Sequence, residues 1–322
     1  MKIALLSAWN PYHAEEFVRS VRAIPGAELV CVWDDDAARG AAFAQRAGVP
    51  FCGDLAAALA SYGARGAIIN AAPWENAPLI CAAAERGLHV LADKIPAMEK
   101  EQADMVARCV QAAPGVFAVA WPLLHRSYFQ TARALVKSGA LGKITMLRLR
   151  GAHSGGSGGT LPRWFYTRAD GGVLTDLGFP LFYAAPWLLN EQPAAVTAVF
   201  SGVLGAAGED NGAAVLRFPS GAVCVGESSY VSHASPFALE LYGEGGTFLA
   251  GGADGGMRID CGEGWQDVTP EPALPSPEAD WVCAVREGNT PLFGLSAGLA
   301  AARMMDAAYA SMREKRTIEL IG

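Results

Sequence analysis

The first 120 residues alternate short apolar runs with segments of helical spacing, and this alternation constrains the fold more than any other feature. Strand-like runs lie at Lys2–Leu6, Glu28–Trp33, Pro50–Cys52, Gly66–Asn70, Val90–Ala92 and Val116–Trp121. Helical spacing lies at Ala14–Ala23, Ala37–Ala47, Leu55–Tyr62, Ala77–Arg86 and Glu101–Ala112. Strands that alternate with helices of about ten residues form a parallel sheet with helices on both faces. We therefore predict an α/β fold whose residues 1–121 form a doubly wound parallel sheet of the Rossmann type.

The rest of the chain, residues 122–322, has a different pattern. After Pro122 come a helix at His125–Ser138 and a strand at Ile144–Leu149, and further helices are expected at Ala279–Glu287 and Ser296–Arg313. Between them lie strands joined by turns, at Ala195–Phe200, Ala213–Phe218, Ala222–Tyr230, Phe237–Tyr242 and Thr247–Ala250. Strands linked by hairpins indicate an α+β domain with a large open, mainly antiparallel sheet. These strands are apolar on both sides and too few helices follow to cover both faces, so we expect a homodimer or homotetramer formed through this sheet.

Composition excludes several classes of protein. With 322 residues, 52% of them hydrophobic, the chain can bury the cores of two domains. No apolar run has the length of a bilayer span and no signal sequence is evident, so we expect a cytoplasmic protein without a membrane partner. A net charge of −7 argues against nucleic acid as a partner. The seven cysteines lack metal-like spacing, so no metal site is expected.

The run Val90–Ala92 predicts a buried strand that presents Asp93 and Lys94 at its carboxyl end. Open α/β sheets bind ligands at that end of their strands. Pro96 prevents an ordinary helix at the preceding residue, so the chain leaves the strand in a fixed turn and Lys94 is held in place. A solvated surface charge at Lys94 is the alternative interpretation.

Asp34 follows the second strand, where a carboxylate can accept hydrogen bonds from an adenosine ribose and oppose a 2′-phosphate. Because no arginine follows before Arg39, we expect NAD in preference to NADP. The first turn has Ser7, Trp9 and Tyr12 where a dinucleotide fingerprint has glycines. The helix that follows can still offer backbone N–H groups to a pyrophosphate. Trp9 could instead cap the sheet, and His13 is interpreted as a packed helix residue.

Three stretches together resemble one known family. Ile69-Asn70-Ala71-Ala72-Pro73, the following helix and His89–Lys94 resemble the Gfo/Idh/MocA oxidoreductases, whose hallmark Glu-Lys-Pro is varied here to Asp-Lys-Ile-Pro. The segments Gly139–Ile144, Gly171–Gly178 and Asp306–Ser311 are also similar to that family, so the resemblance spans nearly the whole chain.

This resemblance implies transfer of a hydride between NAD and a hydroxyl or carbonyl of a sugar, cyclitol or related polyol. It places Lys94 and Asp176 in the catalytic site, but Pro180 stands where the family has a proton-accepting histidine, and Tyr183 where a further aspartate is usual. A lysine that is desolvated beside a positively charged nicotinamide releases its proton more easily and can act as the base. Tyr183, His125 and His153 remain open as substitutes. We expect the cofactor to be bound by Ser7, Trp9, Asn10, Asp34, Ala72, Pro73, Asp93, Lys94 and Trp164.

A glycine-rich stretch, residues 154–159, precedes Trp164, Phe165 and Tyr166. It is either a loop over the cleft or a plain linker, and three aromatic residues favour the loop. The function also has an alternative. Loss of both the glycines and the catalytic histidine would suit a diverged family member without redox activity, acting as a ligand-binding or assembly subunit. Asp34, Lys94 and Asp176 favour the enzyme, because a core needs none of these charges.

Overall fold

The computed structural model describes residues 1–169, 171–233, 237–253 and 255–320. The chain divides into two compact units. The Rossmann unit comprises Met1–Pro122 and Pro275–Arg303, and the sheet unit comprises Leu123–Leu274 and Met304–Gly322. The first segment of the Rossmann unit ends one residue after the predicted division at Trp121, and a later segment, Pro275–Arg303, also groups with this unit. The physical reason is Trp281, which is fully buried and whose indole N–H donates to the backbone oxygen of Val116.

Among the described residues, the Rossmann unit has a five-stranded parallel sheet in the order β2-β1-β3-β4-β5. Its strands are β1 (Lys2–Leu6), β2 (Glu28–Trp33), β3 (Gly66–Ile69), β4 (His89–Asp93) and β5 (Phe117–Ala120). The predicted doubly wound parallel sheet is confirmed. The strand expected at Pro50–Cys52 is wrong, because only a single bridge between Phe51 and Val32 forms there.

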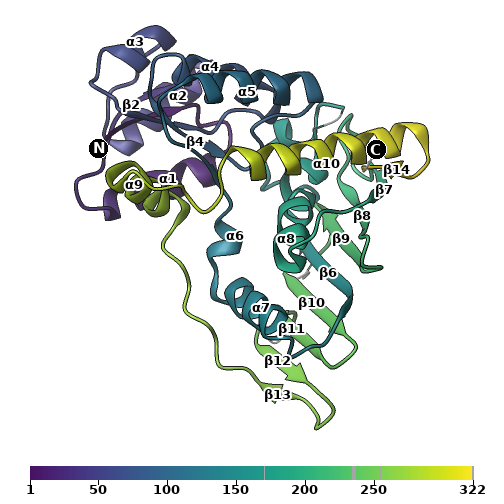
Figure 1. Cartoon of the computed structure of the whole chain (residues 1–322). Helices are drawn as coiled ribbons and strands as arrows, with labels where there is room; N and C mark the ends of the chain where they lie inside the picture. The colour runs from purple at the N-terminus through teal and green to yellow at the C-terminus, as the bar shows by residue number, and fades with distance from the viewer. Residues whose placement is uncertain (170, 234–236, 254, 321–322) are drawn as a thin grey trace. The chain divides into compact units, whose positions relative to one another are not determined.

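The helices of this unit are α1 (Pro11–Ala23), α2 (Ala37–Ala47), α3 (Leu55–Ala60), α4 (Asn76–Ala84), α5 (Lys100–Ala112) and α9 (Pro277–Glu287). Four of them begin at a side chain that accepts a hydrogen bond from a first-turn amide, namely Asn10, Asp36, Asp54 and Ser276. Such caps satisfy amides that a helix leaves without partners. α4 and α5 lie side by side on one face of the sheet, and α1 and α9 lie together on the other (Figure 1).

The strands of this sheet are buried on both faces. Ile3, Leu5 and Leu91 pack with Phe17 of α1 and with Trp281 of α9. Residues that point to the opposite face of the sheet, such as Leu6 on β1 and Ile69 on β3, are also fully buried. Burial of both faces is typical of a parallel sheet and explains the continuous apolar runs in the sequence.

In the described part of the sheet unit, nine strands form one sheet in the order β13-β12-β11-β10-β6-β9-β8-β7-β14. They are β6 (Ile144–Ala152), β7 (Ala195–Ser201), β8 (Asn211–Arg217), β9 (Val223–Ser229), β10 (Ala238–Gly243), β11 (Thr247–Gly251), β12 (Met257–Asp260), β13 (Gln266–Asp267) and β14 (Ile318–Glu319). The sheet is antiparallel except that β6 and β9 run parallel. The predicted large, mainly antiparallel sheet is confirmed.

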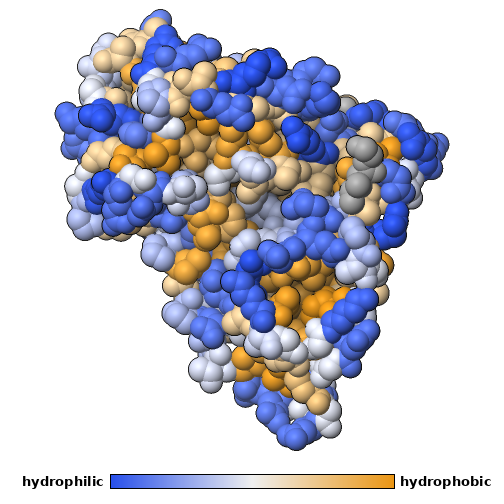
Figure 2. Space-filling model, in the orientation of Figure 1, coloured by the Kyte–Doolittle hydropathy of each residue, from blue (hydrophilic) through white to orange (hydrophobic). Residues whose placement is uncertain are grey.

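The helices of this unit are α6 (Pro122–His125, whose first residue belongs to the other unit), α7 (Ser127–Ser138), α8 (Pro180–Leu189) and the later part of α10 (Leu295–Glu314). α7 and α8 lie on one face of the sheet (Figure 1). Figure 2 shows apolar atoms, ringed by hydrophilic ones, in the region where Figure 1 draws α7 and β6. In the described residues, no helix combines the length and the apolar character needed to cross a membrane.

The face of the sheet that α7 and α8 do not cover carries alternating residues of each strand. Met146 on β6 and Val199 on β7 are 43% and 73% exposed. Arg148 on β6 pairs with Glu227 on β9 at 2.8 Å and with Glu240 on β10 at 3.4 Å. We call this surface the open face. It combines apolar side chains with a row of ion pairs.

Candidate active site

The turn between β1 and α1 is held by its own side chains. Ser7 has a φ of +73°, a left-handed conformation that favours glycine. Its hydroxyl accepts a hydrogen bond from the Trp9 amide (3.1 Å) and donates to Asp34 (3.3 Å). The Asn10 side chain accepts from the His13 amide at 3.2 Å and so caps α1. The turn therefore adopts a backbone conformation suited to glycine although it contains no glycine. Several of its backbone amides donate hydrogen bonds to side chains of this protein.

Asp34 follows β2 and is only 2% exposed. Its carboxylate accepts hydrogen bonds from the amides of Ala8 (2.8 Å) and Asp36 (2.9 Å) and from two nitrogens of the Arg39 guanidinium (2.5 and 3.1 Å). Burial alone would raise the pKa of Asp34, but these donors, Arg39 first, lower it below its usual value. Asp34 is thus ionised and already paired. The sequence analysis did not predict that Arg39 would be its partner.

The end of β3 contributes Asn70, which is fully buried. Its side-chain amide donates to the backbone oxygen of Asn10 at 3.0 Å, whereas its side-chain oxygen has no hydrogen-bond partner among the described residues. Ala72 and Pro73 follow as buried residues at the start of a 3-10 turn, Pro73–Glu75. Trp74 in that turn packs edge-on against Trp9, with ring centroids 5.8 Å apart. Three of the expected cofactor positions, Trp9, Ala72 and Pro73, therefore lie near one another.

Asp93 and Lys94 end β4, as predicted. The Asp93 carboxylate lies 2.7 Å from Nδ1 of His13 and accepts from the Lys94 amide at 2.8 Å. Burial would raise the pKa of Asp93, but the nearby charges of His13 and Lys94 and their hydrogen bonds lower it overall. The Trp121 indole donates to the Lys94 carbonyl at 3.2 Å, which fixes the backbone of the half-buried lysine. His13 therefore has a polar partner in Asp93 and is not the simple packed residue that we expected.

In the sheet unit, Asp176 lies in a π-helical turn, Leu174–Gly178, that runs directly into α8. Turns of this kind are uncommon and frequent at functional sites. The hydroxyl of Tyr230 donates to the Asp176 carboxylate at 3.0 Å. Tyr230 is fully buried, and burial, with the Asp176 charge second, raises its pKa well above the usual value. Sequence reasoning missed Tyr230, because nothing in the sequence brings the end of β9 to Asp176.

Tyr183, His125 and His153 were expected as substitutes for the histidine that Pro180 replaces, and the structure shows where each of them lies. Pro180 begins α8, and Tyr183 on the same helix is buried with its ring 5.6 Å from that of Phe179. His125 is buried at the end of α6. His153 stacks on the Tyr230 ring at 5.3 Å and so contacts the partner of Asp176. Lys94 belongs to the Rossmann unit, and Asp176 and Tyr183 belong to the sheet unit.

The glycine-rich stretch forms a compact turn and not an extended linker. The amides of Gly156 and Ser157 donate to the Tyr230 carbonyl, and the Thr160 amide donates to the Gly155 carbonyl. Trp164, in the 3-10 turn Arg163–Phe165, is 42% exposed. The stretch is therefore anchored on the residue that contacts Asp176, and Trp164 is accessible to a ligand.

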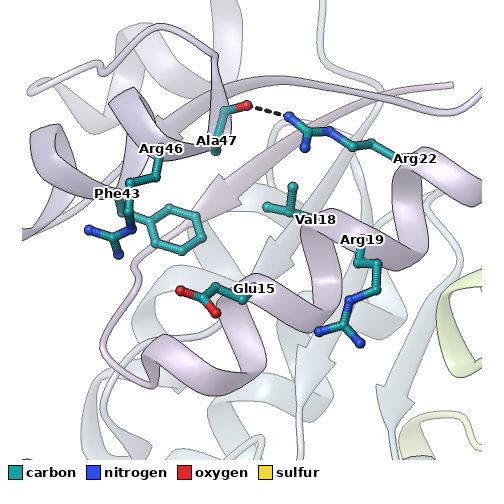
Figure 3. A pocket seen from close by; sticks show the side chains of 7 residues that line it. All are labelled: Glu15, Val18, Arg19, Arg22, Phe43, Arg46 and Ala47. Carbon is teal, nitrogen blue, oxygen red and sulfur yellow. Dashed lines mark hydrogen bonds between the residues drawn. The ribbon is translucent and has the colours of Figure 1, made fainter.

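A surface pocket of about 400 Å³ lies between α1 and α2 of the Rossmann unit (Figure 3). Phe43 and Val18 form its apolar part, and Arg22 reaches across to donate to the Ala47 carbonyl. None of the expected site residues lines this pocket. We assign no catalytic role to it.

The carboxyl edge of the parallel sheet fits a dinucleotide. Polar side chains follow four neighbouring strands there, namely Ser7, Asp34, Asn70 and Lys94. The buried oxygen of Asn70 without a partner among the described residues is unusual in a core and suits a ligand-binding edge. No group of three or more histidine, cysteine or acidic side chains that could hold a metal ion occurs in the described ranges.

Two family models match the chain. Residues 10–121 match the model described as oxidoreductase family, NAD-binding Rossmann fold, and residues 129–249 match the model described as GFO/IDH/MocA C-terminal domain. A search of curated proteins found no match.

Similar solved structures share the whole fold. An aldose-aldose oxidoreductase from Caulobacter crescentus, complexed with glycerol, is 20% identical, with a TM-score of 0.85 and 99% of each chain covered. An oxidoreductase from Agrobacterium radiobacter, in complex with NAD+, L-tartaric acid and magnesium, is also 20% identical, with a TM-score of 0.85 and coverage of 99% of this chain and 98% of that one. A levoglucosan dehydrogenase in complex with NADH and L-sorbose is 19% identical, with a TM-score of 0.85 and coverage of 100% and 99%. With both domain models matched in order along one chain, this protein belongs to the Gfo/Idh/MocA family of oxidoreductases and has an NAD-binding Rossmann domain.

Proposed function

We propose that this protein transfers a hydride between NAD and the hydroxyl or carbonyl carbon of a sugar, cyclitol or related polyol. The observation that carries the proposal is Lys94, held at the carboxyl end of β4 beside the ionised Asp93, whose carboxylate also contacts His13. The similar structures named aldose-aldose oxidoreductase and levoglucosan dehydrogenase support a polyol as the substrate class.

The roles of the chain's own residues follow from their chemistry. When NAD is bound, it supplies the acceptor for the hydride. Lys94 accepts the hydroxyl proton of the substrate during oxidation and returns it during reduction. Asp176, which accepts a hydrogen bond from Tyr230, accepts another from a substrate hydroxyl and orients it. Tyr183 remains a candidate for a supporting role on α8.

NAD is the proposed cofactor, with NADP bound more weakly. Asp34 lies at the end of β2 and is ionised, so it opposes a 2′-phosphate and suits ribose hydroxyls. Its bond to Arg39 must open or shift for the ribose to reach it, because the carboxylate already accepts four strong hydrogen bonds. Ser7, Asn10, Ala72, Pro73 and Trp164 are proposed as further contacts of the cofactor.

A second candidate function has a specific observation in its favour. Backbone amides of the first turn donate hydrogen bonds to the side chains of Ser7, Asn10 and Asp34. In a glycine-rich dinucleotide fingerprint, such amides would be available to the pyrophosphate. Together with Pro180, this supports a diverged family member that binds a ligand or assembles without redox turnover.

We also propose that the protein forms a homodimer or homotetramer through the open face of the sheet unit. The exposed Met146 and Val199 supply apolar area there, and the Arg148 ion pairs supply polar contacts. A cytoplasmic location is proposed because each of the seven cysteines, all of which lie in the described ranges, is a free thiol.

Titration of the purified protein with NADH and with NADPH, followed by nicotinamide fluorescence, tests the cofactor assignment. We expect NADH to bind more tightly, and Asp34→Ala to weaken NADH while it frees Arg39 to favour NADPH. Arg46→Ala, which changes an exposed arginine about two turns beyond Arg39 on α2, is the control and should leave both affinities unchanged. Equal or tighter NADPH binding by the wild-type protein would refute the ribose role of Asp34. Binding of neither cofactor would favour the second candidate.

A further inference from the structure

The hydroxyl of Tyr230 is aimed at the one carboxylate that the proposed function needs in the sheet unit. Its oxygen lies 3.0 Å from Oδ2 of Asp176, and the Gly172 carbonyl lies at 3.5 Å, near the limit of a hydrogen bond. Tyr230 directly follows β9, whereas Asp176 lies in the turn before α8. A long-range contact of this kind, between two segments 54 residues apart, is made by the fold and not by local sequence.

Burial decides which partner carries the proton. The Tyr230 ring is fully buried, and this burial raises the pKa of the phenol well above its usual value. The phenol therefore stays protonated at neutral pH and donates. A carboxylate that accepts such a bond is favoured in its ionised form. Tyr230 is accordingly the hydrogen-bond donor of this pair and Asp176 is the acceptor.

Tyr230 is itself held from three sides. His153 stacks on its ring at 5.3 Å and Tyr166 packs at 6.2 Å. The amide of Gly156 donates to its carbonyl at 2.9 Å, and a Cβ added at Gly156 would lie 2.8 Å from Leu204 Cδ1 and 3.1 Å from the Cβ and the backbone oxygen of Tyr230. The glycine-rich stretch thus packs closely against Tyr230, and a side chain at position 156 would press on it.

We propose that Tyr230 is the positioning residue of the site. Tyr230 keeps the Asp176 carboxylate ionised and oriented, and it links Asp176 to the glycine-rich stretch at residues 154–159. This proposal rests on the proposed function for the role of Asp176 in turnover. No contact of Tyr230 with the substrate is implied.

Other charged and titratable groups surround the pair. Glu209 is buried, accepts from the Tyr309 hydroxyl at 2.8 Å and from the Leu174 amide at 3.1 Å, and its charge also acts on Tyr230. His153 faces the ring of Tyr230. A measured change in the titration of Asp176 must therefore be separated from changes in Glu209 and His153.

The test is the titration of the Asp176 carboxyl carbon by NMR, in protein labelled with 13C at aspartate, with the signal assigned by Asp176→Asn. Tyr230→Phe removes only the phenol oxygen and should move the midpoint of Asp176 upward by about one pH unit or more, since a hydrogen bond to a charged group is lost. Tyr166→Phe, which removes a phenol oxygen from the same aromatic cluster, should leave the midpoint in place. Glutamate labelling and the His153 ring signals report whether those groups have moved.

Gly156→Ala provides a second variant, because the added methyl presses on Tyr230 without changing the phenol. It should shift the midpoint in the same direction by a smaller amount. If Tyr230→Phe does not fold, 3-fluorotyrosine at position 230, whose phenol is a stronger donor, should lower the midpoint. An unchanged midpoint in Tyr230→Phe or with fluorotyrosine would overturn the proposal. These readouts need no turnover, so a failure of the proposed redox function would appear separately, as wild-type protein that binds no NADH or oxidises no polyol.

Discussion

Ser7 and His13 have roles that depend on contacts with residues far away in the sequence. Ser7 occupies a left-handed conformation that glycine usually supplies, and its hydroxyl ties the turn to Asp34. His13 looked like a packed helix residue in the sequence, yet it pairs with Asp93 at 2.7 Å. Neither role could be predicted, because each depends on a partner 27 or 80 residues away. The positions of Lys94 and Asp34 at the carboxyl ends of strands could be predicted, since apolar strands precede both residues.

Replacement of Ser7 separates strain from hydrogen bonding. Ser7→Ala keeps the unfavourable φ and loses the hydroxyl, so we expect the free energy of unfolding to fall by about 1–2 kcal/mol. Ser7→Gly loses the same hydroxyl but relieves about 1 kcal/mol of backbone strain and should be the more stable of the two. Urea unfolding, followed by tryptophan fluorescence, measures which of the two variants is more stable. An alanine variant as stable as the glycine variant would contradict the account of this turn.

Replacement of Asp93 tests the contribution of its charge at the end of β4. The folded-state pKa of Asp93 is lowered, so this charge contributes stability that is present above the unfolded-state pKa of about 4 and is lost as the pH falls through the folded-state value. Asp93→Asn should therefore lower the free energy of unfolding at pH 7 by about 2 kcal/mol, the usual contribution of a hydrogen bond to a charged group. The difference from wild type should shrink below pH 4. If Asp93→Asn lowers the free energy of unfolding equally at pH 7 and pH 3, the charge of Asp93 does not contribute to stability.

At the scale of elements, strands and helices were predictable where one face was apolar and the other polar, or where a buried run was bounded by turn residues. α1, β4 and β8 are examples. α8 was not foreseen, because it is buried almost all round and therefore lacks helical periodicity, and because Pro180 and Pro186 argue against a helix. The parallel pairing of β6 with β9 was also missed, since pairing partners depend on the whole sheet.

At the scale of the whole molecule, the open face of the sheet unit predicts association. Met146→Glu places a charge among its apolar side chains and should shift the protein toward the monomer, because an unpaired charge is costly to bury between copies. Val203→Glu, which adds the same charge at a residue that is 65% exposed in the loop between β7 and β8, is the control and should leave the assembly intact. Light scattering at micromolar concentration measures both variants. A wild-type monomer would contradict the expected assembly outright.

The sequence predicted the two-domain character of the molecule and its family, because long alternating patterns and several motifs agree along the chain. It did not predict that Pro275–Arg303 would join the Rossmann unit. That grouping depends on Trp281, whose burial beside Val116 and Gly66 joins residues more than 160 positions apart.

The most direct test of the central claim is the turnover of Lys94→Met together with its affinity for NADH. If Lys94 handles the substrate proton, this variant should bind NADH as the wild type does and lose turnover of a polyol by a factor of about 10² to 10⁴. Lys94→Arg should fail as well, because a guanidinium stays protonated. Lys100→Met, at an exposed lysine on α5, is the matched control and should remain active. The account predicts intact binding with lost turnover, and a fully active Lys94→Met would contradict it.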